Sequence, residues 1–276
     1  MPAFGGTKLV QLMAQQLQKV YAAKLAEGKS QTTVRHIHAC VHRALEDALR
    51  FALVQRNVAS LVKAPAMGKR PMQVYTPEQA RRFLETAKGE RLEALYVLAL
   101  STGMREGELL GLKWREVDLG GAVIQVQASL KVTTHGKRAL GKPKTAGSRR
   151  KMMLTSTAVA ALKAHRVRQV AERLHSPAWH DTDLVFTNTV GNALDPTNLY
   201  RYDYKPLLRR AGLPMIRLHD LRHTAATLLL LSGVHPKVVS EMLGHSSVNI
   251  TLNLYSHVLP DMQASATSAM ERLLGG

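Results

Sequence analysis

A short stretch rich in proline, glycine and basic residues divides this chain into two unequal parts. It covers residues 64–71 and reads APAMGKRP. Proline lacks a backbone donor and glycine imposes little conformational preference, so such a stretch interrupts helices and strands and is typical of an interdomain linker. We therefore predict a small N-terminal domain over residues 1–64, a linker over residues 65–73 and a larger domain over residues 74–276.

The positive charge of the chain is concentrated in two segments. Its net charge is +18, from 38 Lys and Arg against 20 Asp and Glu. Residues 1–73 hold eleven basic residues and three acids, residues 131–173 hold twelve and one, and the remaining segments are nearly neutral. A generally basic protein would spread this excess evenly, whereas two separate contacts on an extended polyanion require two basic segments. The distribution favours nucleic acid as the partner.

Cysteine usage and hydropathy indicate the compartment. Cys40 is the single cysteine, which excludes an internal disulfide framework and favours a reducing environment. The longest apolar runs cover residues 94–100 and 225–231, far fewer than the ~18 residues that span a bilayer. We expect a soluble, cytoplasmic protein that does not contact a membrane.

The N-terminal domain is predicted to be helical, with helices over residues 8–27 and 30–53. In the second helix Ser30 can serve as the N-cap. Its apolar residues recur at steps of three and four, which places them on one face: Val34, Ile37, Val41, Leu45, Ala48 and Ala52. Arg35 and Arg43 lie off this stripe. They form either an ordinary solvated face or a surface that contacts a DNA backbone.

The larger domain is predicted to be mainly α-helical with a small antiparallel β-sheet. Thr76-Pro77-Glu78 has the residues of a helix start, and further helices are expected over residues 91–100 and 104–112. A strand segment over 117–126 contains a Gly-Gly turn, and residues 150–154 could form a returning strand. Between them, the basic residues 129–151 form either a flexible loop or a β-hairpin that presents a lysine.

The rest of the larger domain has the pattern of consecutive helices. A helix from Thr155 or Ser156 to about Leu174 is expected to bury Leu162, Val167 and Val170. Residues 183–186 are a strand candidate. Five more helices are predicted, over residues 196–211, 219–232, 236–243, 248–255 and 260–274.

Several short segments of the larger domain hold residues suited to phosphodiester chemistry. His219 and Arg222, three positions apart on a helix, share one face. Arg105 with Glu108, His245 after a glycine, and Tyr255 complete the set. Taken singly, each has a simpler explanation, such as a local ion pair, a capped helix start, a helix end or an ordinary tyrosine.

Together and in this order, the segments resemble the tyrosine recombinases, or phage-type integrases, over about residues 74–262. Residues 101–112 (STGMREGELLGL) look like the first arginine box of that family, and PKT at 143–145 with SRR at 148–150 resembles its lysine hairpin. Residues 218–224 (LHDLRHT) are similar to the His-x-x-Arg box. Residues 243–247 (LGHSS) and 251–257 (TLNLYSH) look like the third box and the nucleophile segment.

The resemblance implies roles for particular residues. The catalytic set would be Arg105, Lys144, His219, Arg222, His245 and Tyr255, with Glu108 in support. Two arginines would hold the non-bridging oxygens of a phosphodiester, while Tyr255 attacks phosphorus and forms a 3′-phosphotyrosyl intermediate. His219 would accept the phenol proton and Lys144 would protonate the departing 5′-oxygen. The interval after Arg105 is long for the family, which leaves Lys142 as the substitute for Lys144.

The resemblance also implies an architecture and partners. A helical core-binding domain and a catalytic domain would form a C-shaped clamp on double-stranded DNA, and residues 1–64 look like only the later part of the first. The expected assembly is a homotetramer on two DNA sites, with an accessory DNA-bending or directionality protein as a further candidate partner. The C-terminal helix would pack on a neighbour or on its own domain. No metal or cofactor is expected, and the source would be prokaryotic or phage-encoded.

The expected DNA-binding residues fall in both basic segments. They are Arg35, Arg43, Lys142, Arg149 and Arg150.

Three other interpretations remain. His219 and His223 at i, i+4 would suit a zinc site, but a His-Glu-x-x-His protease needs glutamate where this chain has Asp220. A DNA-binding protein of integrase ancestry without full recombination activity would have the same composition. A type IB topoisomerase shares the chemistry, although the Leu-Gly-His segment followed by a C-terminal tyrosine favours the integrase branch.

Overall fold

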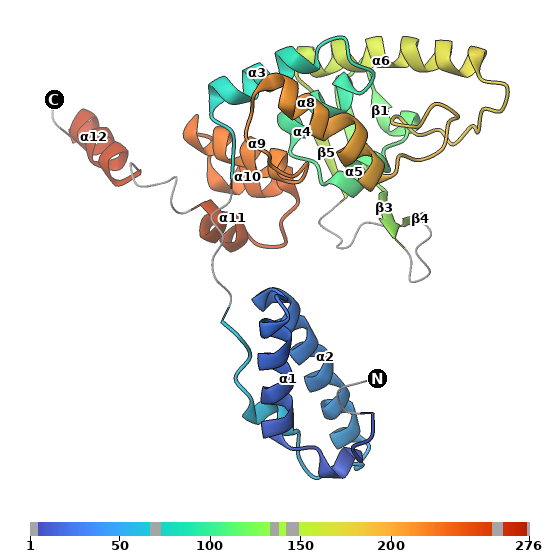
Figure 1. Ribbon diagram of the computed structural model, residues 1–276. Helices are drawn as coiled ribbons and strands as arrows, with labels where there is room; N and C mark the ends of the chain where they lie inside the picture. Colours follow the sequence, from blue (N-terminus) through green and yellow to red (C-terminus); the bar gives the residue numbers. More distant parts are fainter. Residues whose placement is uncertain (1–4, 67–72, 133–137, 142–148, 256–261, 275–276) are drawn as a thin grey trace. The chain divides into compact units, whose positions relative to one another are not determined.

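The computed structural model describes residues 5–66, 73–132, 138–141, 149–255 and 262–274 (Figure 1). The chain divides into two compact units, Met1–Pro71 and Met72–Gly276. The division falls within the linker predicted at residues 65–73. That the first unit is a core-binding domain stays a prediction.

The first unit is built on two α-helices, α1 (Ala14–Ala26) and α2 (Gln31–Arg50), flanked by the short 3-10 helices η1 (Leu9–Gln11) and η2 (Val58–Leu61). The Ser30 hydroxyl accepts the backbone N–H of Thr33 at 3.1 Å, which confirms the predicted cap of α2. Leu17, Tyr21, Val34 and Leu45 form the centre of a small core that η2 closes. The first predicted helix begins later than expected, because residues 9–11 wind as η1.

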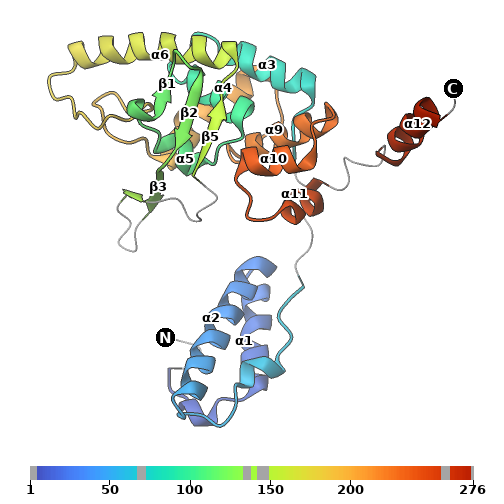
Figure 2. The same ribbon diagram turned by 180° about the vertical axis from the view of Figure 1, so that it is seen from behind.

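In the second unit, helix α4 (Glu93–Thr102) occupies the interior. It packs against both α6 (Ser156–His175) and α9 (Asp220–Leu231), and Figures 1 and 2 show those two helices on different sides of it. Seven of its residues are buried, as expected for a helix that is apolar all round. Because α4 is buried and ends at Thr102, it fixes the position of the segment that follows it, which contains Arg105.

Two small antiparallel sheets accompany these helices. One contains β1 (Val117–Asp118), β2 (Val123–Val126) and β5 (Arg150–Met153), and the other pairs β3 (Ser129–Val132) with β4 (Arg138–Gly141). The returning strand predicted at residues 150–154 is present. It pairs with β2, which lies within the strand segment predicted over residues 117–126, in a register that sets Val126 opposite Arg150. The basic segment therefore connects two neighbouring strands of the same sheet, the central β2 and the edge strand β5.

Helix α5 (Glu106–Leu110), which follows the Arg105 segment, lies against β3. A Cβ atom at Gly107 would meet the Leu130 carbonyl oxygen at 2.7 Å. Only a glycine lets this strand approach the helix so closely. The hairpin of β3 and β4 is thereby placed beside the first arginine segment.

The remaining elements mostly follow the predicted pattern. Thr76 caps α3 (Pro77–Ala87), and a π-helical stretch, η5 (Leu199–Tyr204), joins α7 (Pro196–Asn198) to α8 (Lys205–Ala211). The 3-10 helix η3 (Trp114–Glu116) precedes the first sheet. The chain ends with α10 (Pro236–Leu243), α11 (Val248–Tyr255) and α12 (Met262–Leu274). Among the described residues, no helix is long and apolar enough to cross a membrane.

Two predictions about this unit were wrong. Residues 183–186 form no strand, and Leu184 makes only an isolated bridge to Lys113. On α6, Val167 and Val170 are 72% and 52% exposed. The buried face of α6 instead includes His165 and Gln169, whose side chains hydrogen-bond the Val185 carbonyl at 2.7 and 3.1 Å. Hydrogen-bonded polar side chains thus occupy the buried face in place of the two valines. The spacing of apolar residues does not reveal such hydrogen bonds.

Gly103 provides a test of how tightly α4 and α10 are joined. It has φ +61°, and an added Cβ would lie 2.6 Å from Cδ2 of Leu243, which is fully buried. We expect Gly103→Ala to lower the free energy of unfolding by about 2–5 kcal/mol, from left-handed strain plus overpacking. Gly89→Ala is the matched control, because Gly89 has φ +79° but nothing within 4 Å of the new Cβ. Equal losses in urea unfolding would contradict this.

Candidate active site

The C-terminal end of α10 gathers three arginines. Its last carbonyl groups have no partners within the helix and form the negative end of the helix dipole. Arginines from three different elements donate to three consecutive carbonyls, Arg150 Nε to Met242 at 2.7 Å, Arg222 Nη2 to Leu243 at 2.8 Å and Arg105 Nη2 to Gly244 at 2.8 Å. We call this group the arginine cluster. It joins β5, α9 and the start of α5 around one point.

Arg222 is the most deeply placed member of the cluster. It lies on α9 and is 3% exposed. Besides its bond to Leu243, its Nη1 donates to the Gly103 carbonyl at 2.7 Å. Since Gly103 ends α4 and Leu243 ends α10, one guanidinium holds two helix ends together.

Arg105 is held from both sides. It is the N-cap of α5, where its backbone N–H donates to Glu108 Oε2 at 3.0 Å and its Nη1 donates to Glu108 Oε1 at 2.8 Å. The side chain of Arg105 is 36% exposed, whereas that of Glu108 is 2% exposed. The arginine therefore reaches the surface from a buried carboxylate that fixes its orientation.

Glu108 is shared between two arginines. Arg150 Nη2 donates to its Oε2 at 2.9 Å, and Arg150 Nη1 lies 3.3 Å from its Oε1. Burial alone would raise the pKa of Glu108, but the hydrogen bonds and charge of Arg150, together with the hydrogen bonds of Arg105, outweigh it and lower the pKa. The carboxylate is thus ionised and compensated within the fold.

Arg149 and Arg150 differ in their surroundings. Both were predicted to contact DNA. Arg149 is exposed, whereas the side chain of Arg150 is 8% exposed and belongs to the arginine cluster. Arg150 is paired with the buried carboxylate of Glu108, whereas the bonds of Arg222 described above go to neutral backbone carbonyls, so the geometry gives Arg150 a different task.

His219 and His223 pack edge to face at the start of α9, with ring centroids 5.1 Å apart. The pKa of His219 is lowered by partial burial and by the charge of Arg222. Burial and the neighbouring His219 lower the pKa of His223 to about 4. Both rings are neutral near neutral pH. In the described residues no group of three or more His, Cys, Asp or Glu side chains could hold a metal ion.

His245 follows the left-handed Gly244 that ends α10. Its Nδ1 lies 2.8 Å from the hydroxyl of Thr251, a fully buried residue of α11. Burial, followed by the charges of Arg222 and Arg105, lowers the pKa of His245 to about 4. Because Nδ1 contacts Thr251, the other ring nitrogen, Nε2, points away from Thr251. The same contact links α11 to the segment that follows α10. Tyr255, one turn beyond Thr251, is the last residue of α11.

The start of α9 is anchored by an ion pair absent from the predicted set. Asp220 accepts three bonds from Arg217, from the backbone N–H at 2.8 Å, Nε at 3.1 Å and Nη2 at 2.7 Å. Thr224 links the same turn to the N-terminal edge of the unit, because its hydroxyl accepts the Tyr75 N–H at 3.1 Å. These contacts set the direction in which His219 and Arg222 project.

The structure brings together Arg105, Glu108, His219, Arg222 and His245, and it places the backbone of Tyr255 at the end of the helix tied to them. Lys144 and Lys142 lie outside the described residues. Arg35 and Arg43 are exposed on α2, in the other unit. Sequence reasoning missed the roles of Arg150 and Thr251, and only the Arg217-x-x-Asp220 spacing offered a signal for the anchor.

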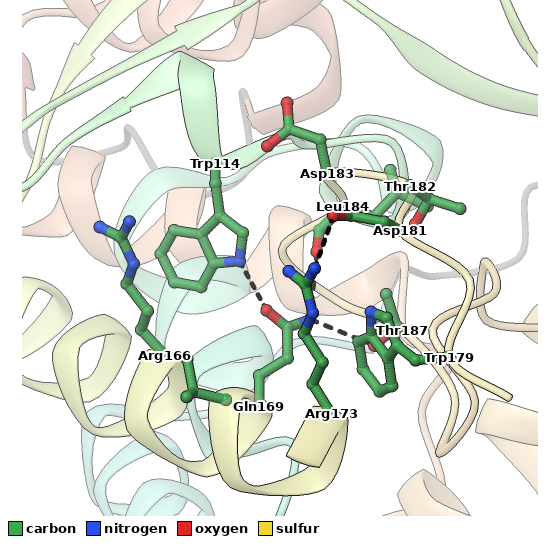
Figure 3. Close-up of a pocket in the computed structure, with 11 residues that line it drawn as sticks. Trp114, Arg166, Gln169, Arg173, Trp179, Asp181, Thr182, Asp183, Leu184 and Thr187 are labelled. Carbon is green, nitrogen blue, oxygen red and sulfur yellow. Dashed lines mark hydrogen bonds and ion pairs between the residues drawn. The ribbon is translucent and has the colours of Figure 1, made fainter. Parts of the chain in front are cut away.

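A separate cavity of about 300 Å³ lies between α6 and the segment around residue 180. Figure 3 shows Trp114, Gln169 and Trp179 among its lining residues. Trp114 Nε1 donates to Gln169 Oε1 at 2.6 Å, and Gln169 Nε2 in turn donates to the Thr187 hydroxyl at 3.1 Å. The predicted catalytic residues do not line it. We therefore place the chemistry at the arginine cluster and not in this cavity.

Comparison with known proteins agrees with this geometry. Residues 73–262 match the model of the phage integrase family. A tyrosine recombinase XerC-like protein of Caldanaerobacter subterraneus is 34% identical over 293 residues, covering 97% of this chain and 73% of that protein. An integrase of Streptomyces ambofaciens is 33% identical over 272 residues, covering 96% of this chain and 70% of the relative.

Solved structures show the same fold. The Tn1549 transposon integrase, in complex with a circular intermediate DNA, superposes with a TM-score of 0.78 at 24% identity, covering 96% of this chain and 86% of that one. The XerH recombinase bound to a palindromic difH substrate gives a TM-score of 0.67 at 20% identity, covering 95% of this chain and 74% of that one.

The chain belongs to the phage integrase family. Its class of activity is that of a tyrosine-type site-specific DNA recombinase.

The lowered histidine pKa values predict a pH-dependent stability. His223 and His245 have pKa values of about 4 in the folded protein against 6.5 ordinarily, so the unfolded chain binds protons that the folded chain excludes. Stability should therefore fall as the pH drops from about 7 to about 5, by about 1 kcal/mol per ring after allowance for solvent screening. Glu108 and Asp220, with lowered pKa values, stay ionised in this window.

Urea unfolding at the two pH values checks this. His245→Asn should show a smaller loss of stability than the unsubstituted protein. A loss of the same size in both proteins would contradict the assignment.

Proposed function

We propose that the arginine cluster, with His219, His245 and Tyr255, is the site where a DNA phosphodiester is cut and rejoined. The observation that carries the proposal is the meeting of residues from distant parts of the chain. Arg105 bonds Gly244, 139 positions away, and Arg222 bonds Gly103, 119 positions away. A fold that served only packing would not need to bring the family's motif segments to one helix end.

The proposed chemistry follows from the charges. A phosphodiester resists attack because its anionic oxygens repel a nucleophile, and the pentavalent transition state carries still more negative charge. Arg105 and Arg222 offset that charge through hydrogen bonds to the non-bridging oxygens. Attack by the Tyr255 oxygen forms the phosphotyrosyl bond at the 3′ end and breaks the bond to the 5′-oxygen. The reverse attack by a 5′-hydroxyl restores the DNA.

The proton transfers need groups with suitable protonation states. His219 is neutral near pH 7, because its pKa is lowered, and it can therefore accept the proton of the tyrosine hydroxyl. His245 would donate from Nε2 to the scissile phosphate. Lys144, or Lys142 in its place, would protonate the departing 5′-oxygen. Glu108 orients Arg105 through two hydrogen bonds.

DNA binding is proposed for exposed basic residues of both units. Arg35 and Arg43 lie on the exposed side of α2, and Arg149 is exposed directly before β5. Lys142 is assigned from the sequence. The assembly would be a homotetramer on two double-stranded DNA sites, with an accessory DNA-bending or directionality protein as a further partner. Contacts with DNA phosphates would explain why the positive charge is concentrated in residues 1–73 and 131–173.

The nucleophile assignment is tested with a suicide substrate, a duplex nicked near the cleavage position so that the released fragment diffuses away. We expect a covalent protein–DNA adduct with the unsubstituted protein and none with Tyr255→Phe, because the phenylalanine ring has no oxygen to attack phosphorus. Tyr202→Phe, which removes the hydroxyl of an exposed tyrosine in the same unit, is the matched control and should retain the adduct.

An adduct that survives Tyr255→Phe would overturn the nucleophile assignment. Failure of the unsubstituted protein to form any adduct, while still binding DNA, would favour an integrase-derived DNA-binding protein.

A further inference from the structure

The geometry points to Arg150 as a positioning residue, which acts on catalysis through Glu108 and the end of α10. This inference rests on the proposed function of the site and adds a residue to which no catalytic part has been given. Its side chain stands between two segments that carry proposed catalytic residues, the α5 start with Arg105 and the α10 end before His245.

Arg150 uses all three of its nitrogens toward these segments. Nε donates to the Met242 carbonyl at 2.7 Å, while Nη1 and Nη2 lie 3.3 and 2.9 Å from the two Glu108 oxygens. A guanidinium is planar and rigid, so three contacts made by one group fix the distance between a carboxylate and a helix end. A lysine, with one small ammonium group, could not make the same set.

Glu108 depends on this arrangement for its charge balance. Its carboxylate is 2% exposed and is bonded by both Arg105 and Arg150. If Arg150 were removed, the buried Glu108 anion would keep its bonds to Arg105 but lose those to Arg150, and leaving such an anion undercompensated is costly. Arg105 would then be drawn toward Glu108 and away from Gly244 and the proposed phosphate position.

The neighbouring arginine shows what a direct DNA contact would look like instead. Arg149 precedes Arg150 and is exposed, whereas the side chain of Arg150 is 8% exposed. Arg149 lies directly before the first residue of β5, and its exposure suits it to a different task from that of the buried Arg150. The pair provides a matched comparison, because each substitution by methionine removes the same charge.

The first experiment compares Arg150→Met with Arg149→Met in single-turnover cleavage at saturating DNA and in binding at several salt concentrations. Arg150→Met should slow cleavage about 100-fold by displacing Arg105, with DNA affinity and its salt dependence unchanged. Arg149→Met should weaken binding and reduce the slope of log affinity against log salt by about 1, as loss of a phosphate contact requires. The opposite pattern, with the reduced slope in Arg150→Met, would overturn the inference.

The second experiment removes the unbalanced anion. Glu108→Gln combined with Arg150→Met should cleave at least about tenfold faster than Arg150→Met alone, because the buried group that draws Arg105 away is then neutral. Arg150→Lys should recover only part of the rate. Purely multiplicative rate losses in the double variant would overturn positioning through Glu108.

The same coupling can be measured without DNA. Arg150→Met should lower the urea midpoint at about pH 7, and the added Glu108→Gln should restore part of it. This readout stays valid if the unsubstituted protein forms no adduct, in which case the proposed function fails while the coupling stands. An unchanged midpoint in Arg150→Met would count against the inference whatever the activity.

Discussion

The end of helix α10 is the constraint on which the rest of the site depends. Arg105, Arg150 and Arg222 bring three positive charges to it, and one carboxylate, Glu108, lies among them. The helix end contributes about half a negative charge. Taken together, these described groups carry about 1.5 positive charges, which favours the binding of an anion. A phosphodiester would complete the balance, and its transition state would complete it better.

Burial, and after it the nearby positive charge, explains the state of the histidines. The charge of Arg222 contributes to lowering the pKa values of His219, His223 and His245, in each case after burial. Neutral rings suit the proposed roles of His219 as the acceptor of the phenol proton and of His245 as a hydrogen-bond donor. A bound phosphate would favour protonation, so the site is prepared to bind a proton when DNA occupies it.

Packing connects this chemistry to the core of the unit. The interior helix α4 ends at Gly103, and Arg222 donates a hydrogen bond to the Gly103 carbonyl. The close approach of Leu243 to Gly103 brings the end of α10 against the end of α4. Thr251 then ties α11 to His245. A continuous set of contacts therefore links the buried helix α4, through the ends of α4 and α10, to α11, which ends at Tyr255.

Much of this could be predicted from the sequence. The bounds of α10 and α11 were predicted as observed, and for α10 the signals were Pro236 at its start and Gly244 at its end. The motif segments also predicted which residues would lie close together. The role of Arg150 could not be foreseen, since its partners Glu108 and Met242 lie 42 and 92 positions away in the sequence. The buried face of α6 was also missed, because His165 and Gln169 are buried through bonds to a distant carbonyl.

We propose that Arg222 acts mainly by offsetting negative charge on the scissile phosphate. The most direct measurement is single-turnover cleavage, by the unsubstituted protein and by Arg222→Ala, of two substrates, one ordinary and one with a neutral methylphosphonate at the scissile position. Structural damage would slow both substrates alike, whereas lost charge compensation would not. We predict that Arg222→Ala slows the ordinary substrate at least about 100-fold and the neutral one at least about tenfold less. The same loss on both substrates would contradict the account.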